Sequence, residues 1–540
     1  MSLSTSAKTD PVRAAGGNPV VGGAPRHTVD QAWIDQVSRG VVSDGTVPAV
    51  ELTTPLTGEV LGTVAQSSRA DVEAAVRAGR MAQVRWARTR LADRSRILLR
   101  FHDLVLEHQS ELLDLVQLES GKTRFHGFEE VADTVIVARH YARRLPGYLA
   151  GTSAQGGLPF LSTARAARRP KGVVGVVAPW NYPLSMSITD AIPALLAGNA
   201  VVLRPDNRAA LSCLRAVQLL EEAGLPDGVL LVVLGDGPSA GQAVVELTDY
   251  VCFTGSTATG RKVAATCAER LVGCSLELGG KNPLYVAADA DLDRAARGAV
   301  TACFGSAGQL CISAERIICH EAIADDFVRR FVALVRQMRL SVDLAYGADM
   351  GSLAGPQQLA TVEEHVEDAR AKGATVLTGG RARPDLGPYV YEPTVLTDVT
   401  EDMLCARGET FGPVVTIYRA RDDRAAIAMC NDTDYGLNAS VWTRDVRRGK
   451  DLARRIDAGT VGVNDGYAAA WTAVGAPMGG MKQSGIGRRH GAEGLRKYTE
   501  EQNVAVQRLV PVQGPAGVDQ SLWTGLLTSG LRSLRVTGWR

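Results

Sequence analysis

The stretch GVVGVVAP, at Gly172–Pro179, is the first of four apolar runs that decide the fold of this chain. The other three are AVVLRP (Ala200–Pro205), VLLVVLG (Val229–Gly235) and DYVCFTG (Asp249–Gly255). The segments that separate these runs have the length of helices. Strands that are apolar throughout and alternate with helices predict a parallel sheet with helices on both faces.

A second alternating series follows, between about residues 311 and 464. Its apolar runs include RIICH (Arg316–His320), PVVTIYRA (Pro413–Ala420) and ASVWT (Ala439–Thr443). Helical patterns lie between them, around 327–338, 361–372 and 425–431. We therefore expect a second α/β domain after the first.

The N-terminal part of the chain has clear local signals. A hairpin or a pair of edge strands is expected over Glu51–Val64, where Pro55 and Gly58 break the apolar pattern. Ser68 and Asp71 have the spacing of a capping box and predict the start of a helix. Helical periodicity then continues until Gly121, which predicts a helix end.

Composition sets limits on the class of protein. With 540 residues the chain is long enough for two or three domains. A net charge of +1 gives no support for a nucleic-acid binder. The nine cysteines are dispersed, without zinc-like spacing, so we expect no metal site and a reduced cytoplasmic location. No run of about 18 apolar residues exists to span a bilayer.

The two ends of the chain differ from the rest in composition. The first 28 residues are rich in Ser, Ala, Gly and Pro without an apolar core, which indicates a disordered tail and not a secretion signal. Residues 506–540 form a C-terminal extension, in which Trp523, Leu526, Leu527 and Leu534 would line one face of a short helix. An ordered contact with another subunit or a loose tail is favoured there over binding to a membrane surface.

Polar residues follow each strand of the first series. In an open parallel sheet, ligands bind beyond the carboxyl ends of the strands. The residues at those ends are Trp180, Asn181, Arg204, Asp206, Asn207, Gly235, Gly255 and Ser256. Turn formation and helix capping explain the glycines and Ser256 equally well. They do not explain an arginine that closes a strand, or Asn181 between two aromatic residues.

Cys311 stands near the end of FGSAGQLCIS (Phe304–Ser313) and is the candidate nucleophile. A thiol is the best side-chain nucleophile near neutral pH, and the preceding Gly-Gln-Leu loop could present it openly. The alternative is that Cys311 is a small buried hydrophobic residue, as free cysteines mostly are.

The chain resembles the aldehyde dehydrogenase superfamily over roughly Pro48 to Gln502. Seven motifs in order carry the resemblance: APWNYP (Ala178–Pro183), GNAVVLRP (Gly198–Pro205), FTGSTATG (Phe253–Gly260), LELGGKNP (Leu276–Pro283), GQLC (Gly308–Cys311), ETFGPV (Glu409–Val414) and PMGGMKQSGIGR (Pro477–Arg488). The resemblance implies an α/β fold with a Rossmann-like cofactor domain, a second α/β catalytic domain and a small β oligomerisation arm. The corresponding boundaries are 29–145 with 171–275, 276–480, and 146–170 with 490–505.

The resemblance also implies a mechanism. The Cys311 thiolate attacks the aldehyde, and the Asn181 amide and the Cys311 backbone N–H stabilise the alkoxide. Hydride transfer to a nicotinamide leaves a thioester, which water activated by Glu277 hydrolyses. The alternative interpretation of Glu277 is a surface carboxylate, although the largely apolar LELGG setting should raise its pKa.

Further positions match the cofactor-binding residues of the family. Gly255 and Ser256 begin a helix whose N-terminus can face the pyrophosphate. Glu409, beside Phe411, matches the carboxylate that holds the nicotinamide ribose. The remaining expected contacts are Pro179, Trp180, Arg204, Asp206, Asn207, Gly235 and Leu278.

The end of the second strand indicates which cofactor is used. Arg204 replaces the usual lysine, and Asn207 stands where members that prefer NAD often carry a glutamate. An arginine without that carboxylate favours a 2′-phosphate, so we expect NADP to be preferred and NAD to be possible. Asp206 could still bind a free 2′-hydroxyl.

Three stretches are most similar to actinobacterial-type succinate-semialdehyde dehydrogenases: Ala476–Leu495, Asn431–Trp442 and Tyr391–Val399. The expected reaction is therefore oxidation of succinate semialdehyde to succinate. The arginines that bind the distal carboxylate in better-known relatives are replaced by Thr189 and Gly305.

Other residues near the substrate leave its identity open. Asp190 replaces a frequent lysine of the family active site. Arg488, Arg489 or His490 could compensate for the missing arginines, or could be solvated surface or interface charge. Tyr467 and Trp471 lie where such enzymes shape the substrate tunnel, and they would equally suit a medium-chain or aromatic aldehyde.

Two other functions and the assembly complete the expectations. A CoA-acylating aldehyde dehydrogenase would usually lack the base that Glu277 supplies, and a catalytically idle member would not need Cys311, Asn181 and Glu277 together. Family resemblance implies a homodimer or homotetramer formed through an arm near 146–169 and the segment after Arg496.

Overall fold

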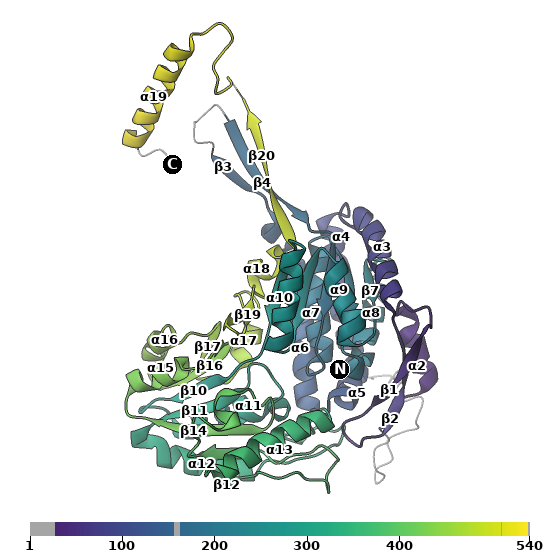
Figure 1. The fold of residues 1–540 in the computed structure, drawn as a ribbon, viewed down its shortest axis with the longest axis vertical. Helices are drawn as coiled ribbons and strands as arrows, with labels where there is room; N and C mark the ends of the chain where they lie inside the picture. The colour runs from purple at the N-terminus through teal and green to yellow at the C-terminus, as the bar shows by residue number, and fades with distance from the viewer. Residues whose placement is uncertain (1–26, 156–161, 509, 538–540) are drawn as a thin grey trace, which may run out of the picture.

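The computed structural model describes residues 27–155, 162–508 and 510–537. All but the last two residues of the predicted N-terminal tail lie outside these ranges. The described chain forms two large sheets with helices on both faces, and a narrow sheet that projects from the body (Figure 1). The expected α/β fold is confirmed.

The four apolar runs of the first series form neighbouring strands of one six-stranded sheet. Its strands, in spatial order, are β19 (Gly485–Ile486), β9 (Gly273–Glu277), β8 (Tyr250–Thr254), β5 (Val173–Val177), β6 (Ala200–Arg204) and β7 (Leu230–Val232). All pairs are parallel except β19 with β9. The carboxyl ends of β5, β6, β8 and β9 therefore meet at one edge, as the strand pattern predicts.

Both faces of this sheet are buried because alternate side chains of each strand enter different cores. Val174 and Val176 of β5 belong to one core, whereas Val173 and Val177 belong to the core on the other face. Helices on the first face are α4 (Leu91–Glu107), α5 (Gln109–Ser120), α6 (Arg124–Leu149), α7 (Pro183–Leu196) and α8 (Leu211–Glu222). Helices on the second face are α3 (Arg69–Trp86), α9 (Gln242–Leu247) and α10 (Thr257–Glu269).

The second series forms a seven-stranded sheet. Its strands, in spatial order, are β12 (Thr375–Thr378), β13 (Thr394–Thr397), β14 (Val414–Ala420), β11 (Ala314–His320), β10 (Asn282–Val286), β16 (Asn438–Trp442) and β17 (Thr460–Val463). Only the β12–β13 pair is antiparallel. The flanking helices are α11 (Leu292–Phe304), α12 (Ala324–Arg336), α13 (Pro356–Ala371), α14 (Leu404–Arg407), α15 (Asp423–Asn431), α16 (Val446–Ala453) and α17 (Ala468–Thr472).

The local N-terminal signals are confirmed. The hairpin consists of β1 (Val47–Thr53) and β2 (Val60–Gln66), preceded by α2 (Gln31–Val37). Ser68 and Asp71 form a reciprocal capping box at the start of α3. α5 ends at Gly121, which has a left-handed φ of 74°.

The projecting sheet consists of β20 (Thr499–Gln507), β4 (Ser162–Pro170) and β3 (Thr152–Gln155), all antiparallel. It joins the body near α18 (Gly491–Arg496), and a short pair, β15 (Tyr435–Gly436) with β18 (Met481–Lys482), lies in the body. The C-terminal extension contains α19 (Gln520–Thr537), which lies beyond the projecting sheet and away from the body (Figure 1). In this helix Trp523 donates to the Val512 carbonyl at 2.7 Å.

A buried ion pair joins the start of β10 to β11. Lys281 Nζ lies 2.5 Å from Glu315, and both side chains are nearly inaccessible to solvent. Glu315 also accepts hydrogen bonds from the backbone N–H groups of Thr410 and Phe411. Because these bonds cross from one segment to another, the pair fixes the loop after Gly408 on the sheet.

We predict that Lys281→Met destabilises the protein by about 3–5 kcal/mol, because it leaves Glu315 buried without its cation. Thermal unfolding followed by circular dichroism would measure the loss. Lys450→Met, at an exposed position of α16, is the control and should change the melting temperature little. Equal melting temperatures for the two variants would contradict this prediction.

Candidate active site

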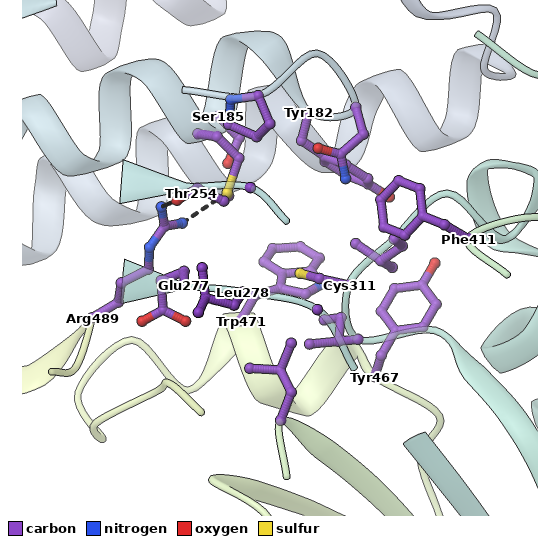
Figure 2. Close-up of a pocket in the computed structure, with 18 of the residues that line it drawn as sticks. Tyr182, Ser185, Thr254, Glu277, Leu278, Cys311, Phe411, Tyr467, Trp471 and Arg489 are labelled. Atoms are coloured by element: carbon purple, nitrogen blue, oxygen red, sulfur yellow. Dashed lines mark hydrogen bonds between the residues drawn. The ribbon is translucent and has the colours of Figure 1, made fainter. Parts of the chain in front are cut away.

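One cavity at the carboxyl edge of the six-stranded sheet collects most of the predicted site residues (Figure 2). Cys311, Glu277 and Asn181 all line it. The predicted cofactor residues that line it are Pro179, Trp180, Gly255, Ser256, Leu278, Glu409 and Phe411. The structure thus brings together segments that lie more than two hundred residues apart in the chain, between Pro179 and Phe411.

Asn181 is fixed in the loop between β5 and α7 by buried charges. Lys122 Nζ donates to the Asn181 carbonyl at 2.7 Å and pairs with Glu130 at 2.5 Å. Glu130 in turn accepts from the N–H groups of Leu184 and Ser185 in the first turn of α7. The Asn181 amide donates one hydrogen bond to the Gln309 carbonyl at 3.0 Å, and a primary amide has a second N–H to offer.

The backbone before Cys311 has an unusual conformation. Ser306, Ala307 and Gly308 have φ values of 50°, 56° and 72°, in the left-handed region. A Cβ atom on Gly308 would lie 2.1 Å from the Gly412 carbonyl oxygen, so only glycine fits. Tyr182 and Ser306 hydroxyls hydrogen-bond at 2.9 Å and hold the loop from the other side.

Asn282 fixes the cysteine itself. Its side-chain amide donates to the carbonyls of Cys311 at 2.8 Å and Ser313 at 2.7 Å. Sequence reasoning did not assign Asn282 a role, although it lies in the LELGGKNP stretch that contains Glu277.

Burial raises the pKa values of Cys311 and Glu277, the two groups that would gain or lose protons in the reaction. Burial raises the pKa of the Cys311 thiol to about 12, and the nearby Glu277 carboxyl adds to the rise. Burial raises the pKa of Glu277 to about 7. The thiol is therefore protonated at neutral pH, whereas Glu277 is close to half ionised and suited to accept a proton. The expectation of a raised pKa at Glu277 agrees with its 6% exposure.

Several groups could hold a dinucleotide. Ser256 caps α10 and directs the N-terminus of that helix to the cavity. Glu409 accepts from the Gly280 N–H at 2.8 Å, and burial, followed by the charge of Glu315, raises the pKa of Glu409 to about 8. Trp180 and Phe411 pack edge to face beside it at 5.6 Å. A buried carboxyl and free helix N–H groups fit a ribose and a pyrophosphate.

The remaining cofactor candidates lie outside the cavity lining, at the ends of β6 and β7. Arg204 is buried, and its Nε and Nη2 donate to the Gly235 carbonyl at 3.0 and 2.6 Å. Asn207 accepts from the Gly235 N–H at 3.0 Å. Asp206 pairs with Arg208, whose guanidinium lies 5.1 Å from the centre of the Trp180 ring. Arg208 was not singled out from the sequence, although it directly follows RPDN.

Two residues that directly follow the PMGGMKQSGIGR motif belong to the cavity. Arg489 and His490 are buried and line it, so solvated surface charge is the wrong interpretation for both. Arg489 pairs with Asp190 and donates to the Thr254 hydroxyl at 2.9 Å. Arg488 is half-buried and bonds the carbonyls of Gly480 and Gly487 instead.

Glu129 of α6 also lines the cavity and could not be found from the sequence. Its carboxyl accepts from the Tyr467 hydroxyl at 3.1 Å, and burial raises the pKa of Glu129 to about 7. Because α6 carries no motif, only the packing of that helix against the cavity shows its place. Tyr467 and Trp471 line the cavity, as expected from their position before PMGG.

Comparison with known proteins agrees with this geometry. The model of the aldehyde dehydrogenase family matches residues 42–504. The chain belongs to the aldehyde dehydrogenase family. It is 50% identical to a Mycolicibacterium smegmatis protein that carries the provisional name succinate-semialdehyde dehydrogenase (NADP+), over 89% of this chain and 93% of the relative.

Two further matches come from other organisms. The mitochondrial succinate-semialdehyde dehydrogenase of rice is 34% identical, over 94% of this chain and 93% of its own. The NAD+ complex of an aldehyde dehydrogenase from Bacillus cereus superposes with a TM-score of 0.82 at 36% identity, covering 85% of this chain and 93% of that one.

The described residues contain no candidate metal cluster and no helix suited to span a membrane. Over 27–155, 162–508 and 510–537, no three His, Cys, Asp or Glu side chains come together as metal ligands. No helix in the same ranges has the length and apolar character needed to cross a bilayer.

We predict that turnover falls as the pH drops through about 7, because Glu277 then takes up the proton that it must receive from water. Glu277→Gln should remove this dependence, lower steady-state turnover by about 10²–10⁴, and leave a cysteine thioester that intact-protein mass spectrometry detects. Glu363→Gln, on the exposed face of α13, is the matched control. Unchanged turnover in Glu277→Gln would rule out this role.

Proposed function

We propose that the chain oxidises succinate semialdehyde to succinate with NADP. The main support for this reaction type is that Cys311, Glu277 and Asn181 line one cavity. Glu409 lines the same cavity. A nucleophile, a base and an amide donor around one space suit attack on an aldehyde and hydrolysis of the resulting thioester.

The residues divide the reaction as follows. Cys311 Sγ bonds to the aldehyde carbon after its thiol proton passes to Glu277, which releases that proton to solvent before the second step. The free N–H of the Asn181 amide and the Cys311 backbone N–H stabilise the alkoxide. A bound nicotinamide cofactor supplies the hydride acceptor. Glu277 then takes a proton from water as that water attacks the thioester on Cys311. The carboxylic acid leaves, and the thiol is restored.

Two observations support NADP. Arg204 and Arg208 place two guanidinium groups at the end of β6, and Asn207 leaves that site without a glutamate. These cations would hold a 2′-phosphate. The provisional name of the 50% identical relative also specifies NADP+. Glu409 would hold the nicotinamide ribose, and NAD remains usable by the same groups.

The names of the relatives support the aldehyde. Arg489 is the one arginine that lines the cavity among the described residues. An observation favours a second candidate, a broad-specificity enzyme for medium-chain or aromatic aldehydes. The cavity lining includes Tyr182, Leu310, Tyr467 and Trp471, which suit an apolar or aromatic substrate. Glu129 adds a further carboxyl to the lining, which would oppose an anionic substrate.

The proposal extends to assembly and location. The projecting sheet of β3, β4 and β20 exposes most of β20, as an arm that pairs with another subunit would. We propose that the chain forms a homodimer or homotetramer through this arm and lies in the cytoplasm. We also propose the domain boundaries 29–145 with 171–275 for the cofactor domain, 276–480 for the catalytic domain, and 146–170 with 490–505 for the arm.

The aldehyde is tested by comparing kcat/KM for succinate semialdehyde, glutarate semialdehyde, hexanal and benzaldehyde. Succinate semialdehyde is expected to have the highest value. A tenfold advantage of hexanal or benzaldehyde, about 1.4 kcal/mol in the transition state, would establish the second candidate instead.

The cofactor is tested by the ratio of kcat/KM for NADP to that for NAD. We expect this ratio to exceed one and to fall at least tenfold in Asn207→Glu, because the new carboxylate repels a 2′-phosphate. Asn207→Gln is the uncharged control and should retain the preference. A wild-type ratio of one or less would overturn the NADP proposal.

A further inference from the structure

Glu129 and Tyr467 form a polar contact in the wall of the cavity. The Tyr467 hydroxyl donates to the Glu129 carboxyl, whose two oxygens lie 3.1 and 3.3 Å from it. Both residues line the cavity, although one lies on α6 and the other directly before α17. A carboxylate has about four lone pairs to offer, so one phenol hydrogen leaves most of its bonding capacity for a ligand.

This contact belongs to the surroundings of the nucleophile. Cys311 packs against a buried apolar cluster that contains Tyr182 and Tyr467. Figure 2 shows Tyr467 and Arg489 on opposite sides of Cys311. A substrate that extends from Cys311 towards Tyr467 therefore meets the Glu129 carboxyl and moves away from the Arg489 guanidinium.

The loop before Cys311 keeps the two tyrosines in place. A Cβ atom on Gly305 would lie 2.7 Å from the Tyr467 hydroxyl oxygen, so a side chain at this position would displace that hydroxyl. The next residue, Ser306, bonds the Tyr182 hydroxyl at 2.9 Å. Position 305 therefore cannot place a cation beside Glu129 while Tyr467 holds its carboxyl.

The charged groups near Glu129 do not neutralise it. Lys122 Nζ lies 2.5 Å from Glu130, its partner on α6, and Glu129 has no ion pair among the described residues. Asp133, one turn further along α6, is another acid that lines the cavity. The cation closest in the chain is therefore already paired, and the nearby acids on the same helix add negative charge.

The other titratable groups on this side are neutral. Burial raises the pKa values of the Tyr182 and Tyr467 hydroxyls well above their ordinary value, and burial lowers the pKa of His126 to about 4. Burial also raises the pKa of Glu129 to about 7, and the Tyr467 hydrogen bond opposes that rise. Near neutral pH Glu129 is thus present both with and without its proton.

We propose that Glu129 is a specificity-determining residue, which distinguishes aldehydes by the charge at their far end. With its proton, the Glu129 carboxyl donates a hydrogen bond to a distal carboxylate such as that of succinate semialdehyde. Without its proton it repels that carboxylate. An uncharged distal group meets no such difference. The inference rests on the proposed function, because it takes this cavity as the aldehyde site.

The preference between two aldehydes of equal chain length should therefore depend on pH. Succinate semialdehyde and butanal differ only in the distal carboxylate. The ratio of kcat/KM for succinate semialdehyde to that for butanal should be highest below pH 7, where Glu129 holds its proton, and should fall as the pH rises through about 7. Titration of Glu277 affects both aldehydes alike and cancels in this ratio.

The test measures the ratio at pH 6 and pH 8 with the full chain. For the wild type we expect a fall of about tenfold, mainly through the KM for succinate semialdehyde, because the protonated fraction changes by that factor across a pKa near 7. Glu129→Gln keeps the shape and an N–H donor without the charge, so its ratio should be the same at both pH values. Glu363→Gln, on the exposed face of α13, is the control and should behave as the wild type.

Tyr467→Phe is the second variant and tests the inference even if Glu129→Gln does not fold. It removes the hydrogen bond that lowers the pKa of Glu129, so the fall in the ratio should move to higher pH. An active wild type whose ratio does not change with pH would overturn the inference alone, as would a ratio that still falls in Glu129→Gln. A wild type that turns over neither aldehyde would overturn the proposed function, and this inference with it.

Discussion

The close contact between the loop at 306–311 and the loop at 409–412 is the constraint on which the site depends. At this contact Gly308 packs against the Gly412 carbonyl with no room for a side chain. Cys311 lies three residues after Gly308, and Glu409 lies three residues before Gly412. The contact therefore brings the candidate nucleophile close to the Glu409 carboxyl, which suits a cofactor. The left-handed backbone from Ser306 to Gly308 is the cost of that approach.

Buried ion pairs hold each side of this contact. Lys122 and Glu130 fix Asn181 and the first turn of α7, whereas Lys281 and Glu315 fix the loop that follows Gly408. A buried pair often adds little net stability, because desolvation offsets the attraction. Here every carboxylate also accepts backbone N–H bonds from a separate segment. The main effect of these two ion pairs is therefore to fix the positions of the loops they bond, and their net contribution to the stability of the fold is smaller.

Burial also sets the pKa values of the carboxyl groups that line the cavity. Glu129, Glu277 and Glu409 all have pKa values raised to about 7 or 8, and burial is the main cause for each. Several carboxyls in one low-dielectric space cannot all be ionised cheaply. Glu129 has the Tyr467 hydroxyl as its hydrogen-bond partner, and Arg489, paired with Asp190, lines the same cavity as a buried cation.

The sequence alone determined the two alternating series, the capping box at Ser68 and the residues at the strand ends, because period and strand composition are local properties. It also singled out Cys311, Asn181 and Glu277 through motifs. Only the tertiary structure decided that Arg489 and His490 are buried, that Arg204 bonds Gly235, and that Glu129 reaches the cavity. Burial and partners depend on the packing of distant segments, which no local pattern encodes.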